Sequence, residues 1–170
     1  MQYYTGKGDQ GETNLFDGSP ISKGKLVFGV IGSLDEATAH LGLAISFCED
    51  PEIIKDLRTI QDHLSKLMGI LAGVKITDLE ETGFLTGAVN WLEIKIKRYG
   101  GSIENPKGFV FAGKSSAGAS IDITRTVIRR AEREAVIYFQ TIEDSKLELL
   151  TYLNRLSSFL FVLRIFTDRQ

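Results

Sequence analysis

Apolar residues recur at steps of three and four along most of the chain after residue 33, which is the spacing of amphipathic α-helices. The clearest run lies between residues 51 and 71. Asp50 and Pro51 open this run as an N-cap and a first-turn residue. We therefore expect a bundle helix whose core face is formed by Ile53, Leu57, Ile60, Leu64, Leu67 and Leu71.

Start and stop signals predict four more helices. Ser33 and Thr77 each stand three residues before a glutamate, which is the spacing of a capping box at a helix start. Gly100 and Gly101 predict the end of the helix that begins at Thr77. Each of the two helices expected in the last third of the chain would be about 35 Å long. The expected ranges are 33–48, 77–100, 116–140 and 144–167.

These segments predict an all-α fold, a five-helix bundle with ferritin-like up-and-down packing in a single domain spanning residues 1–170. Within it, residues 1–32 are expected to form an ordered glycine-rich loop and residues 33–170 the bundle. The last helix is apolar nearly all round, so it should lie at the centre of the bundle or in a subunit interface, and we favour an oligomer. Its apolar seam consists of Leu149, Leu153, Leu156, Leu160 and Leu163.

Composition narrows the class of protein. The 170 residues are 43% hydrophobic and 25% charged, with a net charge of -2 and one cysteine, Cys48, which excludes collagen, disordered tails and disulfide-rich scaffolds. The charge gives no support for bulk binding of nucleic acid. No uninterrupted apolar stretch approaches the roughly 20 residues of a spanning helix, and the polar N-terminus lacks a signal-peptide core. We expect a cytoplasmic protein that binds neither nucleic acid nor membrane.

Residues 125–133 carry the strongest chemical signal. We expect the core face of this helix to consist of Thr124, Ile128, Ala131, Ala135 and Tyr138. Arg129 and Glu132 then lie on one flank together with Arg125, and Arg130 lies on the other flank. Guanidinium groups suit bidentate contact with phosphate or carboxylate, and beside a core they need an anionic partner. A solvated face with Glu–Arg pairs along the helix explains the same charges. The helix alone therefore does not define a site.

Two glycine-containing segments are candidate phosphate loops. Residues 5–13, TGKGDQGET, offer unobstructed backbone amides, hydroxyls, a lysine and an acid for a metal, although plain turn glycines explain them equally well. Residues 108–115 match the P-loop pattern G-x-x-x-x-G-K-[ST]. The residues before them cannot form the buried strand that a P-loop requires, and the four intervening positions are apolar. A P-loop is therefore the lesser alternative.

Taken together, these segments resemble the PduO-type ATP:cob(I)alamin adenosyltransferases. The matching motifs are residues 5–13 followed by Lys23, residues 33–36 (SLDE), residues 125–133 and residues 152–157 (YLNRLS). Four motifs in this order and at these separations, in a helical chain of this length, make the resemblance specific. It implies transfer of the 5′-deoxyadenosyl group of ATP to the cobalt of cob(I)alamin, or a related corrinoid, with release of triphosphate.

The resemblance also implies a homotrimer with sites between subunits, and Mg²⁺ bound through the ATP phosphates without an assigned protein ligand. It implies that Arg125 pairs with Asp35 across the interface, and that Arg129, Arg125 and Asp35 are catalytic. Phe109 matches the aromatic residue that displaces the lower axial ligand of the corrinoid. The ATP-binding residues that it implies are Thr5, Gly6, Lys7, Gly8, Asp9, Gly11, Thr13, Lys23, Arg129, Arg130, Glu132, Arg133 and Asn154.

The chain departs from the family pattern at three places. Residues 111–115 read FAGKS where the family often reads LPGGS, Asp122 stands where a histidine is common, and Ala37–Thr38 replaces the usual Leu–Asn. The first two bear on the corrinoid contacts and leave the ATP contacts unchanged.

Two other functions stay open. One is a nucleotide- or corrinoid-binding sensor or delivery protein without fast turnover, and the other is a P-loop phosphotransferase built on Gly108–Ser115. The sequence also leaves open which corrinoid is preferred, and whether the product is handed to a B12-dependent enzyme.

Overall fold

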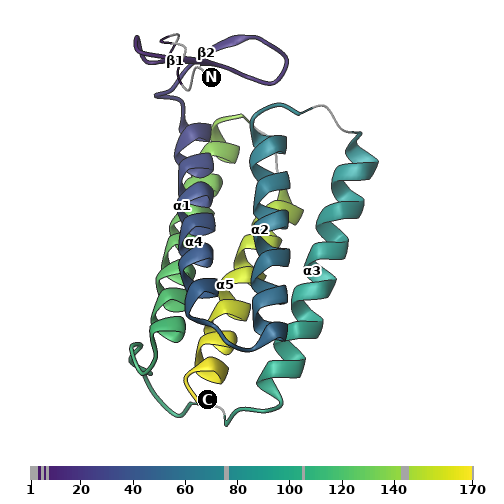
Figure 1. The fold of residues 1–170 in the computed structure, drawn as a ribbon. Helices are drawn as coiled ribbons and strands as arrows, with labels where there is room; N and C mark the ends of the chain where they lie inside the picture. Colours follow the sequence, from purple (N-terminus) through teal and green to yellow (C-terminus); the bar gives the residue numbers. More distant parts are fainter. Residues whose placement is uncertain are drawn as a thin grey trace.

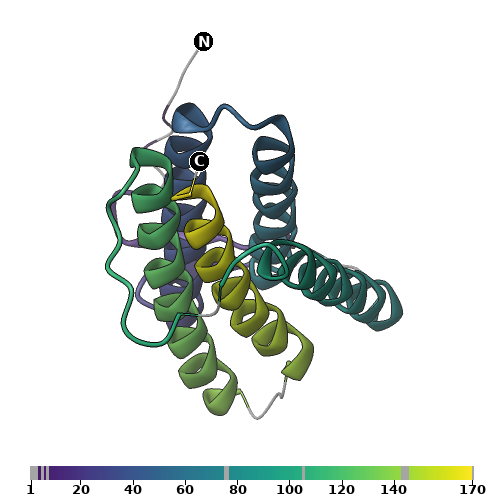
Figure 2. The same cartoon turned by 90° about the horizontal axis from the view of Figure 1, so that it is seen from below.

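Five long helices run alternately up and down in the computed structural model, which describes residues 4, 6, 8–74, 77–104, 106–142 and 146–169 (Figure 1). Helix α2 packs on α1, α1 on α4, α4 on α5, and α5 on α3. Seen from below, α5 lies between α4 and α3 (Figure 2). The predicted all-α five-helix bundle is confirmed. The helices are α1 (Leu26–Phe47), α2 (Pro51–Leu71), α3 (Asp78–Gly100), α4 (Ser116–Thr141) and α5 (Leu147–Thr167).

Helix α1 begins at Leu26, so the predicted start at Ser33 is wrong. Ser33 lies inside α1, is only 5% exposed, and donates its hydroxyl hydrogen bond to Glu134 of α4 at 2.6 Å. Val27 and Val30, ahead of it, are buried against the bundle, and this burial extends the helix past the capping-box signal. The bundle therefore starts within the segment that was expected to be loop.

The predicted starts of α2, α3 and α4 agree with the structure. The Asp50 carboxylate accepts hydrogen bonds from two backbone amides in the first turn of α2, at 2.8 and 3.3 Å. Thr77 and Glu80 form the reciprocal capping box at the start of α3. Helix α5 begins at Leu147, and the start expected at Asp144 lies outside the described residues.

A short hairpin interrupts the N-terminal segment that was expected to be loop throughout. Strands β1 (Glu12–Asn14) and β2 (Pro20–Ser22) pair antiparallel. In the turn between them Gly18 has a φ of 85°, and Asp17 accepts hydrogen bonds from the amide and hydroxyl of Ser19 at 2.9 and 2.6 Å. The hairpin lies beyond the end of the bundle at which α1 begins (Figure 1).

Helix α5 is the central helix, which accounts for its apolar circumference within one chain. All five leucines of its predicted seam are buried, and its sides contact α3 and α4. By length and average hydropathy, α1 and α5 could each cross a membrane, because an average tolerates interrupting polar residues. The most apolar stretch of α5 is mostly buried inside the bundle, as is typical of a core helix, whereas only a third of that of α1 is buried.

An aromatic cluster surrounds His63 where α2, α3 and α5 meet. The Nδ1 atom of His63 lies 3.2 Å from the Tyr152 hydroxyl. The His63 ring is edge-on to the rings of Phe84 and Trp91, at centroid distances of 5.6 and 5.5 Å. Burial, and secondarily the charge of Lys66, lower the pKa of His63 below its ordinary value. The neutral imidazole is therefore the form that fits the folded protein.

We expect the free energy of unfolding to decrease as the pH falls below about 6.5, toward the lowered pKa of His63 in the folded state. In this window the unfolded chain binds a proton at His63 and the folded chain does not, so acid favours unfolding. Urea denaturation at about pH 7.5 and about pH 5.5 measures the loss. His63→Gln removes the titrating group while keeping a polar partner for Tyr152, and an unchanged loss in this variant would contradict the assignment.

Candidate functional site

Helix α4 presents the predicted arginines to solvent from a well-anchored core face. Its N-cap is Ser115, whose hydroxyl oxygen accepts a hydrogen bond from the Gly118 amide at 2.9 Å. Four of the five predicted core residues are buried, Tyr138 is half-buried, and Val127 and Phe139 join the core as well. The four buried residues are Thr124, Ile128, Ala131 and Ala135.

Arg130 and Glu132 leave α4 on opposite flanks, as predicted. The Arg130 Nε donates to the Ser33 hydroxyl at 3.2 Å, and its guanidinium forms an ion pair with Glu36 of α1. On the other flank, Glu132 accepts a hydrogen bond from the Asn154 amide of α5 at 3.1 Å. The structure thus ties these predicted nucleotide-site residues to the helices on either side of α4.

Arg129 is exposed between these two anchored flanks. Among the described residues, its guanidinium takes part in no hydrogen bond or ion pair. Its backbone carbonyl accepts a hydrogen bond from Arg133 at 3.0 Å, which places a second exposed guanidinium one turn further along α4. An exposed pair of arginines whose neighbour Arg130 is already neutralised by Glu36 can take a polyanion without disturbing the fold.

Lys23 is hydrogen-bonded to two backbone carbonyls of the glycine loop. Its ammonium donates to the Gly8 carbonyl at 2.8 Å, and its amide donates to the Gly11 carbonyl at 2.8 Å. A Cβ at Gly8 would lie 2.7 Å from the Lys23 ammonium, so glycine makes room for this approach. Asp9 is exposed in the same turn, and Thr13 lies half-buried in β1.

The described hydrogen bonds of this loop run within it and to the end of α2, where the Phe16 amide donates to the Ala72 carbonyl at 3.0 Å. Arg129, by contrast, lies in the middle of α4. Among the described residues, no hydrogen bond or ion pair joins the loop to the arginines within a single chain. Two of the predicted loop residues, Thr5 and Lys7, lie outside the described residues.

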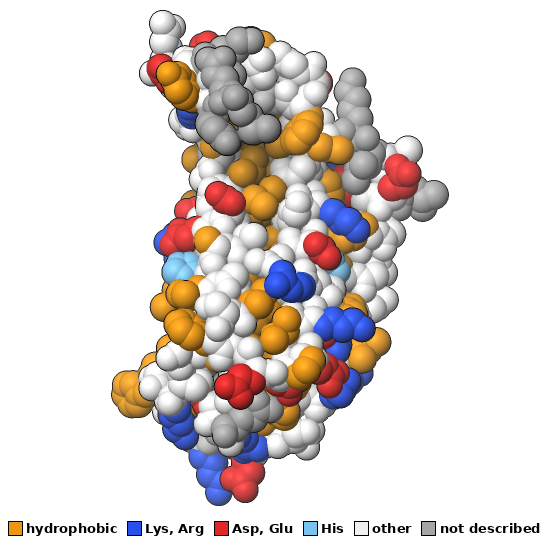
Figure 3. Space-filling view, in the orientation of Figure 1, with side chains coloured by type: hydrophobic (Ala, Val, Ile, Leu, Met, Phe, Trp, Pro, Cys, Tyr) orange, Lys and Arg blue, Asp and Glu red, His pale blue; other side chains and the backbone are white. Residues whose placement is uncertain are grey.

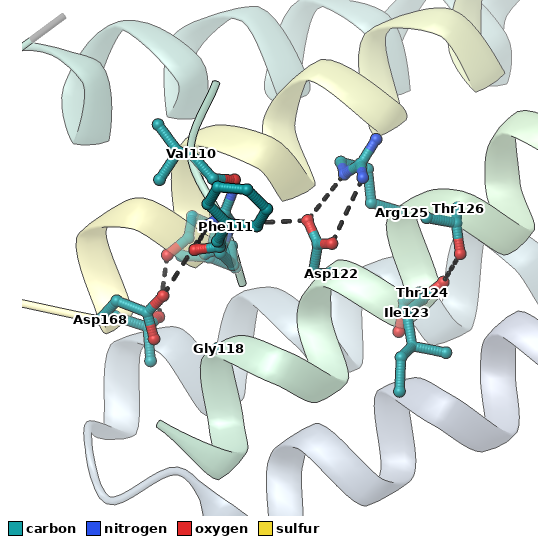
Figure 4. Close-up of polar contacts among 12 residues, drawn as sticks. Val110, Phe111, Gly118, Asp122, Ile123, Thr124, Arg125, Thr126 and Asp168 are labelled. Carbon is teal, nitrogen blue, oxygen red and sulfur yellow. Dashed lines mark hydrogen bonds and ion pairs between the residues drawn. The ribbon is translucent and has the colours of Figure 1, made fainter. Parts of the chain in front are cut away.

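Within the chain, Arg125 pairs with Asp122 on its own helix, with Nε–Oδ1 2.8 Å and Nη2–Oδ2 3.3 Å (Figure 4). Asp35 lies exposed on α1. The predicted pair of Arg125 with Asp35 concerns two subunits, and stays a prediction.

Phe109 lies on the segment between α3 and α4, at the end of the bundle opposite the hairpin (Figure 1). Its side chain is 86% exposed and meets the ring of Phe111, itself 80% exposed, edge to face at 4.9 Å. Sequence reasoning missed Phe111, although two aromatic residues separated by one position in an extended segment can face the same side. Together they form an apolar surface at this end of the bundle.

A cavity of about 400 Å³ opens at the same end, between the end of α1 and the start of α4. It is away from the arginines at the middle of α4, and it lies next to the segment that carries Phe109. Its wall is mixed, with apolar side chains beside the carboxylates of Glu49 and Asp50, so it does not suit a phosphate and is a candidate part of the ligand surface next to Phe109. Its lining includes Phe47, Cys48, Ile53, Ser115, Ser116 and Thr167.

The P-loop alternative at Gly108–Ser115 is wrong. A P-loop joins a buried strand of a parallel sheet to a helix. The described residues before Ser116 form an irregular connection, and over the described part of the chain the sheet consists of the antiparallel pair β1–β2. Lys114 is exposed on this connection.

Comparison with known proteins identifies the family. Residues 3–167 match the family described as cobalamin adenosyltransferase. A corrinoid adenosyltransferase of Bacillus subtilis is 33% identical over 165 residues, covering 95% of this chain and 83% of the relative. A cobalamin adenosyltransferase of Cupriavidus metallidurans is 33% identical over 162 residues, covering 94% and 84%.

A solved structure agrees with these relatives. It is a variant of a PduO-type ATP:corrinoid adenosyltransferase from Lactobacillus reuteri, complexed with cobalamin and ATP. It superposes with a TM-score of 0.84 at 25% identity, covering 99% of this chain and 94% of that one. This chain belongs to the cobalamin adenosyltransferase family.

Proposed function

We propose that this protein transfers the 5′-deoxyadenosyl group of ATP to the cobalt of cob(I)alamin or a related corrinoid, with release of triphosphate. Membership of the family over residues 3–167 supports the reaction. The structural observation that carries it is the exposed Arg129 guanidinium on α4, flanked by Arg130 and Arg133. The whole chain then acts as one adenosyltransferase domain.

The chemistry explains the residue types. The reduced cobalt is itself the nucleophile: it attacks C5′ of the ribose, and the C5′–O bond breaks with its electron pair leaving on triphosphate. The protein therefore needs no nucleophile of its own. It must align the two substrates and stabilise negative charge on the leaving group, which arginine, lysine and backbone amides do well. Mg²⁺ would be held mainly by phosphate oxygens, with the exposed Asp9 carboxylate as a ligand from the loop.

The ATP site is assembled from two subunits in this proposal. The glycine loop of one subunit contributes Thr5, Gly6, Lys7, Gly8, Asp9, Gly11, Thr13 and Lys23. Helices α4 and α5 of the neighbour contribute Arg129, Arg130, Glu132, Arg133 and Asn154. The separation of the loop from the arginines within one chain supports this division, and Arg125 would then meet Asp35 across the interface.

Exposed apolar side chains on α1 and α4 support a subunit interface, which the proposal places in a homotrimer. Leu43 and Phe47 of α1, and Ile123 and Ile137 of α4, are each at least two-fifths exposed. Large apolar residues gathered on a pair of packed helices are typical of a subunit interface. Figure 3 shows, in the orientation of Figure 1, a face on which basic and acidic side chains are interspersed with apolar ones.

The corrinoid would bind at the apolar surface of Phe109 and Phe111, beside the cavity between α1 and α4. A product held at this exposed surface is accessible to a docking enzyme, so we include delivery to a B12-dependent enzyme in the proposal. The free thiol of Cys48 fits the reducing environment of the cytoplasm.

The proposal is tested by mixing the protein with ATP, Mg²⁺ and chemically reduced cobalamin. We expect the visible spectrum to change to that of adenosylcobalamin while triphosphate accumulates in equal amount. A sensor or delivery protein without fast turnover would bind ATP tightly, yet it would form no cobalt–carbon bond. That result would replace the proposed enzyme with the binding function.

Lys114→Ala should leave the KM for ATP within about twofold of the wild-type value. The lysine is exposed on an irregular connection that lacks the strand of a P-loop. Steady-state measurement of triphosphate release checks this. A loss of turnover in Lys114→Ala, with Arg129 variants fully active, would instead favour a phosphotransferase at residues 108–115.

A further inference from the structure

One buried side chain holds the backbone beneath the two exposed phenylalanines. Arg164 of α5 is only 2% exposed. Its Nη1 donates to the Phe111 carbonyl at 3.0 Å, and its Nη2 donates to the Val110 carbonyl at 3.1 Å. An arginine is almost never this deeply buried unless its donors find acceptors and its charge finds a partner. The connection between α3 and α4 supplies the acceptors.

Two carboxylates supply the negative charge that balances the Arg164 guanidinium. Asp122 of α4 lies 3.4 Å from the Arg164 Nε, and Asp168 lies 4.0 Å from its Nη1. The Nε itself makes no hydrogen bond among the described residues, so Asp122 acts on it as a nearby charge. The same carboxylate accepts two hydrogen bonds from Arg125, so it serves two guanidinium groups at once (Figure 4).

A second set of hydrogen bonds holds the end of the connection between α3 and α4. The Asp168 carboxylate accepts hydrogen bonds from the Ser115 amide at 3.1 Å and from the Ser115 hydroxyl at 2.8 Å. A Cβ at Gly118 would lie 2.1 Å from that carboxylate oxygen, so only glycine leaves room for it. The segment is therefore held at residues 110–111 and at residue 115, while the rings of Phe109 and Phe111 remain in solvent.

We infer that Arg164, balanced by Asp122, is a positioning residue that presents Phe109 and Phe111 to the corrinoid. The inference rests on the proposed function. Since Arg164 holds the two carbonyls, the ordering of this segment is achieved on folding and does not have to accompany binding. Arg164 lies on α5 beneath the phenylalanines and away from Arg129, so it acts on the corrinoid and leaves ATP binding unchanged.

The test compares Arg164→Met, which keeps an unbranched chain but removes every donor, with Arg164→Lys, which keeps the charge. We expect Arg164→Met to raise the KM for reduced cobalamin about tenfold and to leave the KM for ATP within about twofold. Arg164→Lys should lie between wild type and Arg164→Met. The matched control is Arg98→Ala, which removes an exposed arginine paired with Glu52 on α2 and should change neither KM.

A second readout does not depend on turnover. Hydrogen exchange of the amides at residues 109–115 should be faster in Arg164→Met than in wild type or Arg98→Ala, without cobalamin present. Equal rises in both KM values, or unchanged exchange in this segment, would overturn the inference. If Arg164→Met fails to fold, the KM values and the hydrogen exchange of Arg164→Lys are compared with those of the wild type instead. Absence of adenosyl transfer by the wild type would overturn the proposed function, while the exchange comparison would still test the positioning role.

Discussion

Arg129→Ala should lower the rate of triphosphate release by about 10²- to 10³-fold, the usual effect of removing one donor that stabilises charge in a transition state. In the proposed reaction, negative charge develops on the triphosphate oxygen as the C5′–O bond breaks. A guanidinium placed against this group stabilises the transition state more than the bound ATP. The loss should therefore appear mainly in kcat, with a smaller change in the KM for ATP.

The Arg129→Ala variant should fold as the wild type does. Among the described residues the Arg129 guanidinium holds no partner, so its removal leaves the hydrogen bonds of α4 intact, and the free energy of unfolding should change by less than about 0.5 kcal/mol. Arg129→Lys keeps a charge without the planar fork, and should recover only part of the rate. Turnover of Arg129→Ala within about threefold of wild type would remove this residue from the mechanism.

Asp56→Ala should lower the free energy of unfolding by about 3–5 kcal/mol, since it breaks a buried ion pair from one side. Asp56 is 2% exposed on α2, and it accepts contacts from two residues of α3: the Lys95 ammonium at 2.7 Å and the Tyr99 hydroxyl at 2.8 Å. Burial first, and the hydrogen bond to Asp56 second, raise the pKa of Tyr99 well above its ordinary value. Without the carboxylate, the buried Tyr99 hydroxyl loses its acceptor, and the largely buried Lys95 ammonium keeps only Glu52, at 3.5 Å.

Urea denaturation at neutral pH measures this loss. Asp56→Asn keeps an acceptor for Tyr99 and should cost less than Asp56→Ala. The control is Glu52→Gln, which weakens exposed ion pairs with Lys95 and Arg98 and should cost no more than about 1 kcal/mol. If Asp56→Ala were no more destabilising than Glu52→Gln, the α2–α3 contact would not depend on this buried pair.

Local sequence signals located most helix ends because those ends are capped locally. Asp50 and Thr77 bond amides within three residues, so their pattern is readable without the rest of the fold. Ser33 shows the same spacing, yet its hydroxyl reaches Glu134 on another helix, 101 residues away in sequence. The preceding apolar residues decide the start of α1, and their burial depends on tertiary packing that the capping pattern does not contain.

In the candidate site, too, the sequence predicts the features that depend on one helix and misses those that depend on tertiary packing. The opposite flanks of Arg130 and Glu132 follow from helical periodicity alone, and the structure confirms them. Arg164 gave no such signal, because its acceptors are backbone carbonyls 53 and 54 residues away whose position only the fold determines. In the proposed function the glycine loop and the arginines meet across two subunits, and neither periodicity within one helix nor packing within one chain can display such a contact.

The hydrogen bonds that Ser115 donates to Asp168 make the turn after α5 part of the support for the segment that precedes α4. Shortening the chain to Thr167 would release Ser115 and leave Arg164 with one acid fewer.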